Sequence, residues 1–436
     1  MVILQNLNKH FEQIKKGRIL VIVKKLRSFI YLLLQIPFYL ISIPLVLIIR
    51  LIKPWYLIRW QELISSRMGH FALNTELYCC ERDAEINLPS QRHIDLFCLR
   101  KYVCNRQLEK MWRRSRLIIL PRWLLIPLSR VNRFFSLFIS TGKEHEIEET
   151  SNHDRDVYNL LDKFSSHISF TDKEKLKGKE ILKKFGLTKN AKFVCLIVRD
   201  AGYLNRHIEH KYEDRWQYHS YRDEDINKYV LAAEELARRG YYVFRMGIKV
   251  LKPLKSSNPK VIDYANSDMR SDFMDIYLGA NCFFCITNGT GIDAIPAIFR
   301  RPLACIIVPF GYTWTYSNKF LLLTKHHINK RNQKKLTVSE IFSSNVAASL
   351  CTNEFKKNEV ELEENSQEEI RDLVVEMEER LTGRWRETEE DLLLQKKFWS
   401  IFEENINQLR LKKPLHGKIK SRFGAKFLRD NKNWIR

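Results

Sequence analysis

The sequence lacks a cysteine framework. Its nine cysteines are an odd number, and they are scattered along the chain instead of recurring at regular spacings. Several stand in short apolar runs, where a thiol behaves as a small hydrophobic side chain. Cys282 and Cys285 have the spacing of a metal or redox pair, but two phenylalanines separate them and no second pair exists. These features exclude a disulfide scaffold, indicate a reducing compartment, and disfavour zinc or thiol redox chemistry.

Acidic side chains are scarce relative to basic ones, 51 against 74, which gives a formal charge of +23. Residues 1–70 hold 11 basic and 2 acidic side chains, and the last 26 residues hold nine and one. Residues 354–380 are acidic instead, with 11 acidic against 4 basic side chains. No zinc-finger, RNP or helix-turn-helix spacing accompanies the positive charge, so nucleic acid is not a predicted partner. Basic ends beside an apolar N-terminal segment favour an anionic membrane surface.

Charge is absent from residues 28–49, a run of 22 positions. That run is long enough to cross a bilayer, and it lies too far along the chain and is too long for a cleaved signal peptide. Pro37 and Pro44 interrupt it, and both flanks are basic, so the positive-inside rule assigns no orientation. We therefore expect a kinked monotopic hairpin with both ends cytoplasmic, with a spanning helix or a buried core helix as alternatives. Three aromatic residues follow at positions suited to the headgroup region: Trp55, Tyr56 and Trp60.

The rest of the chain alternates strand-like apolar runs with helix-like stretches. A length of 436 residues with 45% hydrophobic side chains is enough for two packed domains. The alternation predicts an α/β protein with two Rossmann-like, doubly wound domains and an N-terminal membrane-associated helical segment. The expected division is a membrane-anchoring segment over 1–65, a first domain over 66–165, a second over 166–350, and, over 351–436, helices that pack back on the first domain followed by a basic tail.

The most informative motif lies within residues 281–299, NCFFCITNGTGIDAIPAIF. It reads as a buried strand, a glycine turn and the first turn of a helix, an arrangement that exposes unpaired backbone N–H groups to a phosphate. The alternative is a tight turn without a ligand. The candidate binding residues here are Asn288, Gly289, Thr290, Gly291 and Asp293.

Further polar or glycine loops follow three other predicted strands. They are Arg199-Asp200, Arg245-Met246-Gly247 and Pro309-Phe310-Gly311-Tyr312. Ligands of doubly wound sheets bind outside the carboxyl ends of the strands, so this clustering favours a ligand site. Arg199 and Arg245 could each offer a forked cation to a diphosphate, with Gly247 beside them, although an interdomain salt bridge is the alternative for each arginine.

Two acidic or histidine-rich stretches are candidate metal sites. Asp223-Glu224-Asp225 stands where a long helix is expected to begin, which favours capping, and His207-Ile208-Glu209-His210 is more typical of a solvated loop. No metal and no cofactor is therefore expected.

An acceptor hydroxyl needs a general base within reach. His70 and Glu76, in or after the glycine turn at Arg67-Met68-Gly69-His70, are the candidates from the first domain, and Asp200 is the rival from the second. The alternatives are hydrogen bonding or capping for His70 and a solvated helix face for Glu76.

Several motifs together resemble bacterial glycosyltransferases from surface-polysaccharide gene clusters. The motifs that carry the likeness are RMGHFALNTELY at 67–78, CNRQLEKMWRR at 104–114, VRDAGYLN at 198–205, YRDEDINKYVLAAEELARRGYYVFRMG at 221–247, DFMDIYLGANCFFCITNGTG at 272–291 and the closing GAKFLRDNKNWIR. VRDAGYLN is also similar to the strand-end loop of fucosyltransferases. There an arginine neutralises the leaving diphosphate, a role that the resemblance gives to Arg199. The second basic residue and the glycine-aspartate of those enzymes are absent here.

The resemblance implies a GT-B fold, with the nucleotide-sugar donor held mainly by the second domain, without a metal, and the acceptor by the first. It implies a membrane-associated glycosyltransferase that acts on a surface-polysaccharide or polyprenyl-linked glycan, at the cytoplasmic face of a bacterial inner membrane. The alternatives are a pyruvyl or glycerol-phosphate transferase on the same fold and a non-catalytic membrane scaffold.

Overall fold

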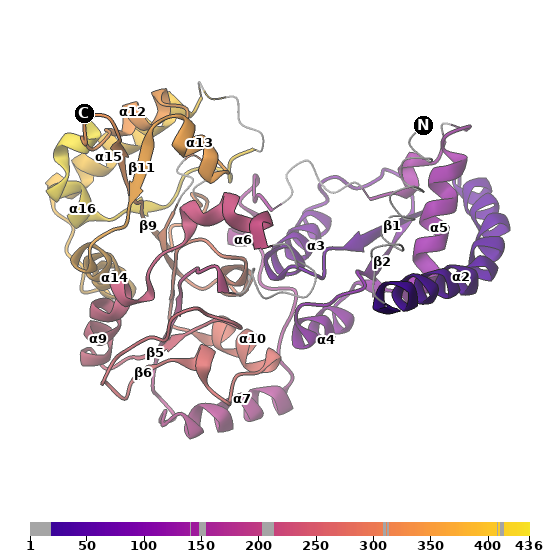
Figure 1. Cartoon of the computed structure of the whole chain (residues 1–436), viewed down its shortest axis with the longest axis horizontal. Coiled ribbons are helices and arrows are strands. Elements are labelled where there is room, and N and C mark those ends of the chain that lie inside the picture. The colour runs from indigo at the N-terminus through magenta and orange to yellow at the C-terminus, as the bar shows by residue number, and fades with distance from the viewer. Residues whose placement is uncertain are drawn as a thin grey trace. The chain divides into compact units, whose positions relative to one another are not determined.

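The computed structural model describes residues 19–139, 141–147, 154–202, 213–307, 311, 314–407, 409 and 414–436. The chain forms two compact units, each built from several separate segments (Figure 1). Unit 1 consists of Met1–Leu63, Pro89–Lys101 and Leu117–Glu148, and unit 2 of Ile64–Leu88, Tyr102–Arg116 and Glu149–Arg436. The units are thus discontinuous in sequence, whereas the sequence suggested consecutive domains.

Unit 1 holds a three-stranded parallel sheet in the order β1-β2-β3. Its elements are α2 (Ile19–Ile52), β1 (Leu57–Leu63), β2 (His93–Leu99), β3 (Ile118–Ile119), α5 (Arg122–Phe135) and η2 (Lys143–His145). The apolar runs IDLFCL at 94–99 and LIIL at 117–120 have strand length, and they form β2 and β3. The helices that follow β1 and β2, α3 and α4, belong to unit 2.

Trp60 lies inside unit 1 and not at a headgroup position. It is 3% exposed within β1, packs with Val46, Cys98 and Leu125, and stacks on His145 with ring centroids 5.5 Å apart. The sequence analysis missed β1 because LIRWQEL directly follows an apolar run, and it was therefore assigned to the membrane segment.

The predicted hairpin over residues 28–49 is also wrong. Helix α2 continues through Pro37 and Pro44 without reversing. Its second half is held by its neighbours: Val46 is fully buried, and Arg50 bonds to Asn132 Oδ1 through Nε at 2.9 Å. Packing against α5 therefore offsets the backbone hydrogen bonds that the two prolines remove.

Unit 2 is built on a seven-stranded, wholly parallel sheet in the order β12-β9-β8-β7-β4-β5-β6. Its strands are β4 (Phe193–Ile197), β5 (Tyr242–Arg245), β6 (Val261–Ile262), β7 (Cys285–Thr287), β8 (Leu303–Ile306), β9 (Phe320–Leu323) and β12 (Arg422–Phe423). A separate antiparallel pair is formed by β10 (His326–Asn329) and β11 (Val360–Glu363). Central β4, β7 and β8 are buried throughout, as continuous apolar strands of a covered parallel sheet are.

Helices cover both faces of this sheet. The α-helices of unit 2 are α3 (Thr75–Asp83), α4 (Arg106–Arg114), α6 (Leu160–Lys163), α7 (Asp172–Lys184), α9 (Val230–Arg238), α10 (Asp272–Asn281), α11 (Ala294–Ile298), α12 (Val338–Ser343), α13 (Thr352–Lys357), α14 (Gln367–Thr382), α15 (Glu389–Ile406) and α16 (Ala425–Asp430). Among the described residues, one π-helix, η1 (His70–Asn74), and several 3-10 helices accompany them: η3 (Glu213–Arg222), η4 (Ile226–Tyr229), η5 (Tyr264–Asn266), η6 (Gly291–Asp293) and η8 (Lys432–Ile435). Right-handed crossovers place α9 on one face and α10 and α11 on the other.

Local sequence signals locate many of these elements correctly. Thr171 and Glu174 form a capping box that opens α7, and Gly240, with φ +98°, follows the helix that ends at Arg238. The part of the chain after residue 351 belongs to unit 2. Helix α14 packs on α9, β8 and β9, and β12 joins the sheet itself, while Lys418 and Lys420 bond to Asn159 and Asp162, within the range expected for the first domain.

Candidate functional site

The topological switch point of the sheet lies between β4 and β7. From β4 the chain winds through β5 and β6 to one edge, then returns to β7 and continues to the other edge. The connections after β4 and β7 therefore diverge at the carboxyl edge, which is where doubly wound sheets bind their ligands. A hydrogen bond joins the two loops, from the backbone N–H of Arg199 to Oδ1 of Asn288 at 2.8 Å. The structure thus brings the predicted loops after β4 and β7 together.

Asn288 positions the backbone of two arginines. Its side chain is 1% exposed, and besides accepting from Arg199 it donates from Nδ2 to the carbonyl oxygen of Arg222 at 3.0 Å. The Arg222 guanidinium donates in turn to the carbonyl oxygen of Gly289 at 3.4 Å. A buried amide therefore holds Arg199 and Arg222 at the same end of the sheet.

The charges at this edge are predominantly positive. Burial and the neighbouring Arg222 lower the pKa of Arg199, while Asp223, 3.0 Å from Arg199 Nε, acts in the opposite direction. Burial, together with Arg222, Arg199 and Arg67, lowers the pKa of His219 to about 3. Three guanidinium groups therefore act on one imidazole and keep it neutral at pH 7. Such an excess of partly buried cations favours binding of an anion, and forked guanidinium donors suit a phosphate or diphosphate.

A contact between two glycines brings the first glycine turn to this site. A Cβ on Gly69 would lie 3.1 Å from the Cα of Gly291, and a Cβ on Gly291 would lie 3.2 Å from the backbone N of Gly69. This approach of backbone to backbone leaves no room for larger residues and places η1, which begins at His70, beside the loop after β7. His70 is therefore near the switch point, although it belongs to unit 2 and not to the first domain.

The glycine loop itself offers fewer free N–H groups than the sequence suggested. The N–H of Gly289 donates to Thr287 Oγ1 at 3.2 Å, that of Thr290 to Asp293 Oδ2 at 2.9 Å, and that of Ile292 to Thr290 Oγ1 at 3.3 Å. Thr290 and Asp293 form a capping box at the start of a short 3-10 turn, and α11 behind it has only five residues. Gly289, at φ +81°, makes the turn. Anion binding here thus depends on the arginines more than on the loop backbone.

Asp293 is buried behind the loop and does not face a ligand. It is 3% exposed, and its Oδ2 accepts from both Thr290 N and Thr287 Oγ1. Burial raises the pKa of this carboxyl to about 6. The group therefore stabilises the turn most when it is protonated.

This pKa predicts a pH dependence of folding. Because the pKa of Asp293 is higher in the folded than in the unfolded protein, its protonation stabilises the fold. This contribution is present below about pH 4 and is lost as the pH rises through about 6. Relative to Asp293→Asn, whose amide oxygen can accept both hydrogen bonds, the wild-type free energy of unfolding should fall by about 2 kcal/mol between pH 4 and pH 7. Urea denaturation of both proteins at four pH values measures the difference, and parallel curves would contradict the assignment.

Arg245 is placed beneath the site and not in it. Its side chain is 0% exposed, with Nη1 3.1 Å from Asp263 Oδ1 and Nη2 3.7 Å from Asp200 Oδ2. Asp200 in addition accepts the backbone N–H groups of Gly202 and Leu251, both at 2.8 Å. Gly247, at φ +154°, packs its backbone against Val250. These residues hold the loops after β4 and β5 together, so the predicted open clamp of Arg245 is replaced by a buried ion pair.

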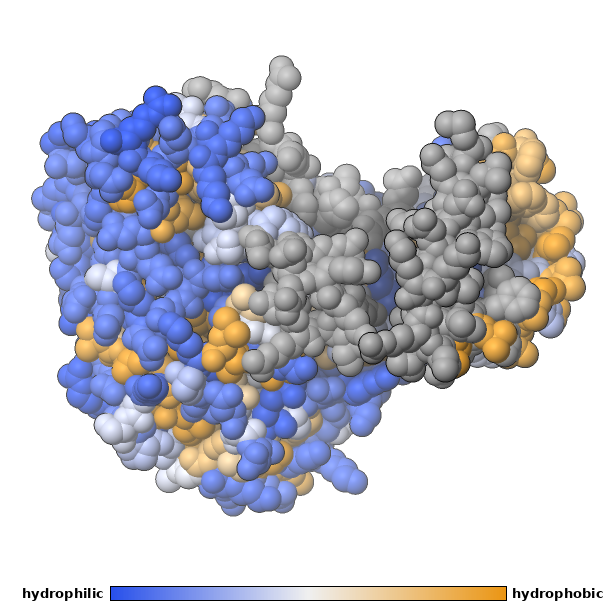
Figure 2. Space-filling view, in the orientation of Figure 1, coloured by the Kyte–Doolittle hydropathy of each residue, from blue (hydrophilic) through white to orange (hydrophobic). Residues whose placement is uncertain are grey.

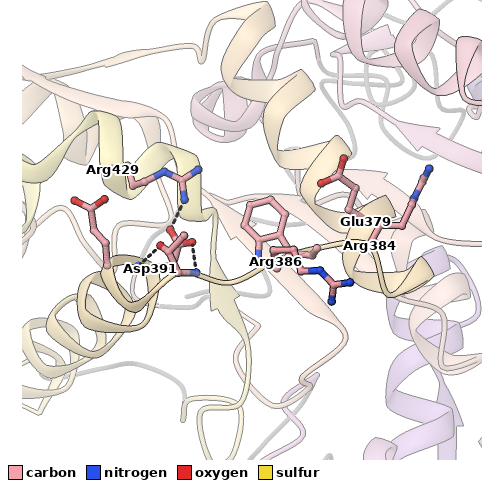
Figure 3. Close-up of a pocket in the computed structure, with 8 residues that line it drawn as sticks. Glu379, Arg384, Arg386, Asp391 and Arg429 are labelled. Carbon is pink, nitrogen blue, oxygen red and sulfur yellow. Dashed lines mark hydrogen bonds and ion pairs between the residues drawn. The ribbon is translucent and has the colours of Figure 1, made fainter.

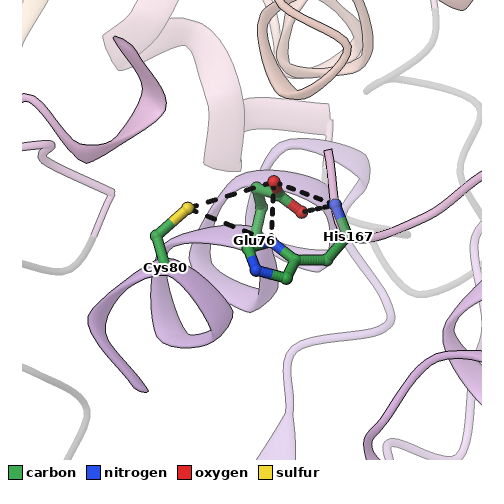
Figure 4. A group of neighbouring side chains, drawn as sticks. All are labelled: Glu76, Cys80 and His167. Atoms are coloured by element: carbon green, nitrogen blue, oxygen red, sulfur yellow. Dashed lines mark hydrogen bonds and ion pairs between the residues drawn. The ribbon is translucent and has the colours of Figure 1, made fainter. Parts of the chain in front are cut away.

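Glu76 belongs to a separate buried cluster with Cys80 and His167 (Figure 4). Its carboxylate is 0% exposed and lies 2.6 Å from Arg300 Nη2 and 3.0 Å from His167 Nδ1. Burial and Glu76 raise the pKa of the Cys80 thiol far above its usual range, so it stays protonated. Because the Arg300 guanidinium already neutralises the carboxylate, the cluster is better described as an ion-pair network than as a metal site. The solvated helix face suggested for Glu76 is wrong.

A cavity of about 490 Å³ lies between the end of α14, the start of α15 and α16 (Figure 3). The charges around it are mostly paired, as Arg429 is with Asp391 and Arg384 with Glu378. None of its lining residues follows β4 or β7. It offers no reactive group comparable to the arginine cluster.

The other predicted elements are partly outside the described residues. His207 to His210 and most of Pro309–Tyr312 fall there. The Asp223 to Asp225 stretch divides its roles instead of forming a metal pair: Asp223 pairs with Arg199, Glu224 bonds to Tyr229, and Asp225 caps η4.

No protein-family model and no curated protein matches the chain. Several solved structures are similar to it, including the following two. One is a glycosyl transferase family 9 protein from Veillonella parvula DSM 2008, with 11% identity, 62% of this chain and 86% of that chain covered, and a TM-score of 0.37. The other is the ADP-heptose lps heptosyltransferase II of E. coli, with 13% identity, 61% and 90% covered, and a TM-score of 0.36.

Arg222, His219 and Arg67 were missed by the sequence analysis as members of the site. Arg222 and His219 lie on η3, a 3-10 segment that follows no strand, so the rule that ligands gather at strand ends does not select them. Arg67 stands in the turn before Gly69, and only the contact with Gly291 brings that turn to the sheet edge. The available signal was two arginines within motifs that had already been singled out, at 67 and 222.

Proposed function

We propose that the protein is a glycosyltransferase that binds a nucleotide-sugar donor at the switch point of unit 2. The observation that supports this is the pairing of Arg199 and Arg222 across the ends of β4 and β7, held by Asn288. Both cations are partly buried, and one acidic side chain, Asp223, opposes them directly. A nucleoside diphosphate supplies the anion that this arrangement lacks.

Sugar transfer requires stabilisation of the negative charge that builds up on the departing diphosphate. Guanidinium groups fixed before the reaction provide it without rearrangement, which lowers the barrier more than flexible cations do. Arg199 and Arg222 would contact the diphosphate, and Asn288 would act as a positioning residue for both. The two guanidinium groups would stabilise the negative charge of the leaving diphosphate in place of a divalent metal, so we propose metal-independent transfer.

The acceptor hydroxyl loses a proton in the same reaction. His70 begins η1 beside Gly291, which makes it the preferred general base among the three candidates. Asp200 and Glu76 are both engaged by cations or backbone N–H groups, which favours structural roles for them. We propose that the acceptor is a surface-polysaccharide or polyprenyl-linked glycan at the cytoplasmic face of a bacterial inner membrane, since α2 offers a lipid-binding helix.

The function is tested by thermal-shift measurements on the full chain with UDP, GDP, CDP, ADP and dTDP, each with and without manganese. A nucleotide present at 100 times its dissociation constant should stabilise the fold by about 2.7 kcal/mol, without any need for the metal. The nucleotide-sugar of the best ligand is then the donor for a transfer assay.

The outcomes separate the alternatives. Release of nucleoside diphosphate during transfer supports glycosyl transfer over pyruvyl transfer. Stabilisation only with manganese would contradict the metal-independent mechanism. Absence of any shift in a folded protein would overturn the nucleotide site and favour a membrane scaffold.

A further inference from the structure

The outer face of α2 is unusually apolar for a helix that packs on a folded unit. Among the described residues, one stretch, Leu33–Ile52, is long and apolar enough to cross a membrane, and 11% of it is buried. Apolar side chains gather over this region in the space-filling view (Figure 2). The exposed large side chains of the stretch and the turn after it are Leu33, Leu34, Ile36, Phe38, Leu40, Ile41, Ile43, Leu45, Leu47, Ile48, Leu51, Trp55 and Tyr56.

The same helix is bound along its second half to α5. Phe38 packs on Trp123 with ring centroids 5.1 Å apart, and Tyr39 accepts a hydrogen bond from Arg130. Near the other end, Arg50 Nη2 donates to the carbonyl oxygen of Asn132 at 2.7 Å. These contacts fix residues 38–50 of α2 at the level of α5.

Helix α5 and the residues after it extend the apolar surface. Trp123 is 55% exposed, and the short stretch from Phe134 to Ile139 exposes Phe134, Leu137 and Phe138 by 58%, 77% and 74%. Phe134 and Phe138 contact each other edge to face at 5.4 Å. The sequence analysis placed no lipid-binding residue in this part of the chain.

Polar side chains on α5 limit how deeply α2 can lie in a lipid bilayer. Arg130 and Arg133 project from α5, and Asn132 is buried against the end of α2. If α2 crossed the bilayer, residues 38–50 would take these cations into the hydrocarbon region, at a cost of several kcal/mol. An orientation in the plane of the interface leaves the cations among the headgroups.

Charge complementarity indicates the composition of the membrane. The segments of unit 1 contain seventeen Lys or Arg and six Asp or Glu side chains. The sequence of unit 1 thus carries an excess of basic side chains, and each one that lies near an anionic membrane surface is attracted to it by about 1 kcal/mol.

We propose that the exposed faces of α2 and α5, together with residues 134–139, form one docking face that lies in the plane of an anionic bilayer. The chain is then held on one leaflet by two helices and does not span the membrane. This inference deepens the membrane part of the proposed function, and unit 1 becomes the part that holds the enzyme at the surface where a lipid-linked acceptor is found.

The first experiment measures binding of the full chain to vesicles by flotation. Vesicles of phosphatidylcholine alone are compared with vesicles that contain 30% phosphatidylglycerol, at low and high salt. We expect binding to rise with anionic lipid and to fall with salt. The double variant Leu137→Glu/Phe138→Glu should lower the partition coefficient at least about tenfold, because two exposed apolar side chains are lost from the docking face.

A matched control uses the same substitution elsewhere. Leu176 on α7 is 61% exposed and lies in unit 2, so Leu176→Glu should leave partitioning unchanged. Equal binding of the double variant and the wild type would overturn the role of α5. Vesicle-independent dimerisation that the double variant abolishes would show that the face binds a second copy instead, and would also overturn the proposal.

The second experiment determines on which side each end of α2 lies. Eight of the nine cysteines are buried, so a Cys351→Ser background gives low labelling. Leu26→Cys and Trp55→Cys, at positions 57% and 72% exposed, should react with a membrane-impermeant maleimide from the same side of sealed membrane vesicles. Labelling from opposite sides would show a spanning helix and overturn the proposal. Neither experiment uses a nucleotide, so failure of the sugar-transfer function leaves this result unaffected.

Discussion

Replacing Arg199 by alanine is expected to lower kcat/KM for sugar transfer about a hundred- to thousandfold. Loss of one fixed donor to a developing negative charge costs about 3–4 kcal/mol in comparable sites. The same change leaves Asp223 without its partner 3.0 Å away, which adds a negative charge beside the diphosphate. Arg222→Ala should behave similarly, because its guanidinium lies at the same edge and donates to Gly289. The measurement is the rate of nucleoside diphosphate release together with nucleotide affinity by calorimetry.

Two further variants make this result specific. Arg199→Lys keeps the charge but loses the fork, and it should recover part of the affinity and little of kcat. Arg238, on α9, is 66% exposed and pairs with Glu235, so Arg238→Ala removes one surface cation without affecting the site. If Arg238→Ala and Arg199→Ala reduced activity equally, the effect would reflect net charge, and the switch-point site would be wrong.

Replacing Glu76 by alanine is expected to destabilise the fold by about 3–5 kcal/mol. The side chain is 0% exposed, and its removal leaves the Arg300 guanidinium, 16% exposed, without its anionic partner, while His167 keeps only its contact with Asp83. Breaking one side of a buried ion pair costs more than the pair contributes, because an uncompensated charge remains. Chemical denaturation of the wild type and the variant measures the loss.

A double variant distinguishes the structural role from a catalytic one. Glu76→Met with Arg300→Met replaces both charges by apolar groups of similar size, so stability should return to within about 1–2 kcal/mol of the wild type. If Glu76 were the general base, Glu76→Gln would instead abolish kcat while the denaturation midpoint stayed unchanged. That outcome would contradict the ion-pair assignment.

The sequence was sufficient to place the candidate site at the carboxyl edge of the parallel sheet. Short apolar runs such as KFVCLIV and LACIIV are typical of buried strands, and glycine or proline residues mark where such runs end. The positions of these strands could therefore be predicted from the local sequence. The parallel order follows from helices between consecutive strands. Arg199 and Asn288 could be named because each directly follows a strand, and they do meet there.

The sequence could not predict which charged side chains form buried ion pairs. Arg199 and Arg245 look equivalent as arginines at strand ends, but Arg245 is fully buried between Asp200 and Asp263. That difference depends on residues 18 and 45 positions away, which no local pattern reports. The glycine contact at 69 and 291 is equally non-local, since it requires two turns over 200 residues apart to approach within van der Waals distance.

The pairing of Glu76 with Arg300 also has a consequence for biosynthesis. The two residues are 224 positions apart, and the chain leaves the ribosome from its N-terminus. At about 5–20 residues per second, translation supplies the arginine about 11–45 s after the glutamate. Helix α3 must therefore emerge well before Arg300 exists, and during that interval His167 is already available to Glu76. The complete ion-pair network can form only once the last third of the chain is being translated, which makes nascent-chain length a determinant of when this cluster can first assemble.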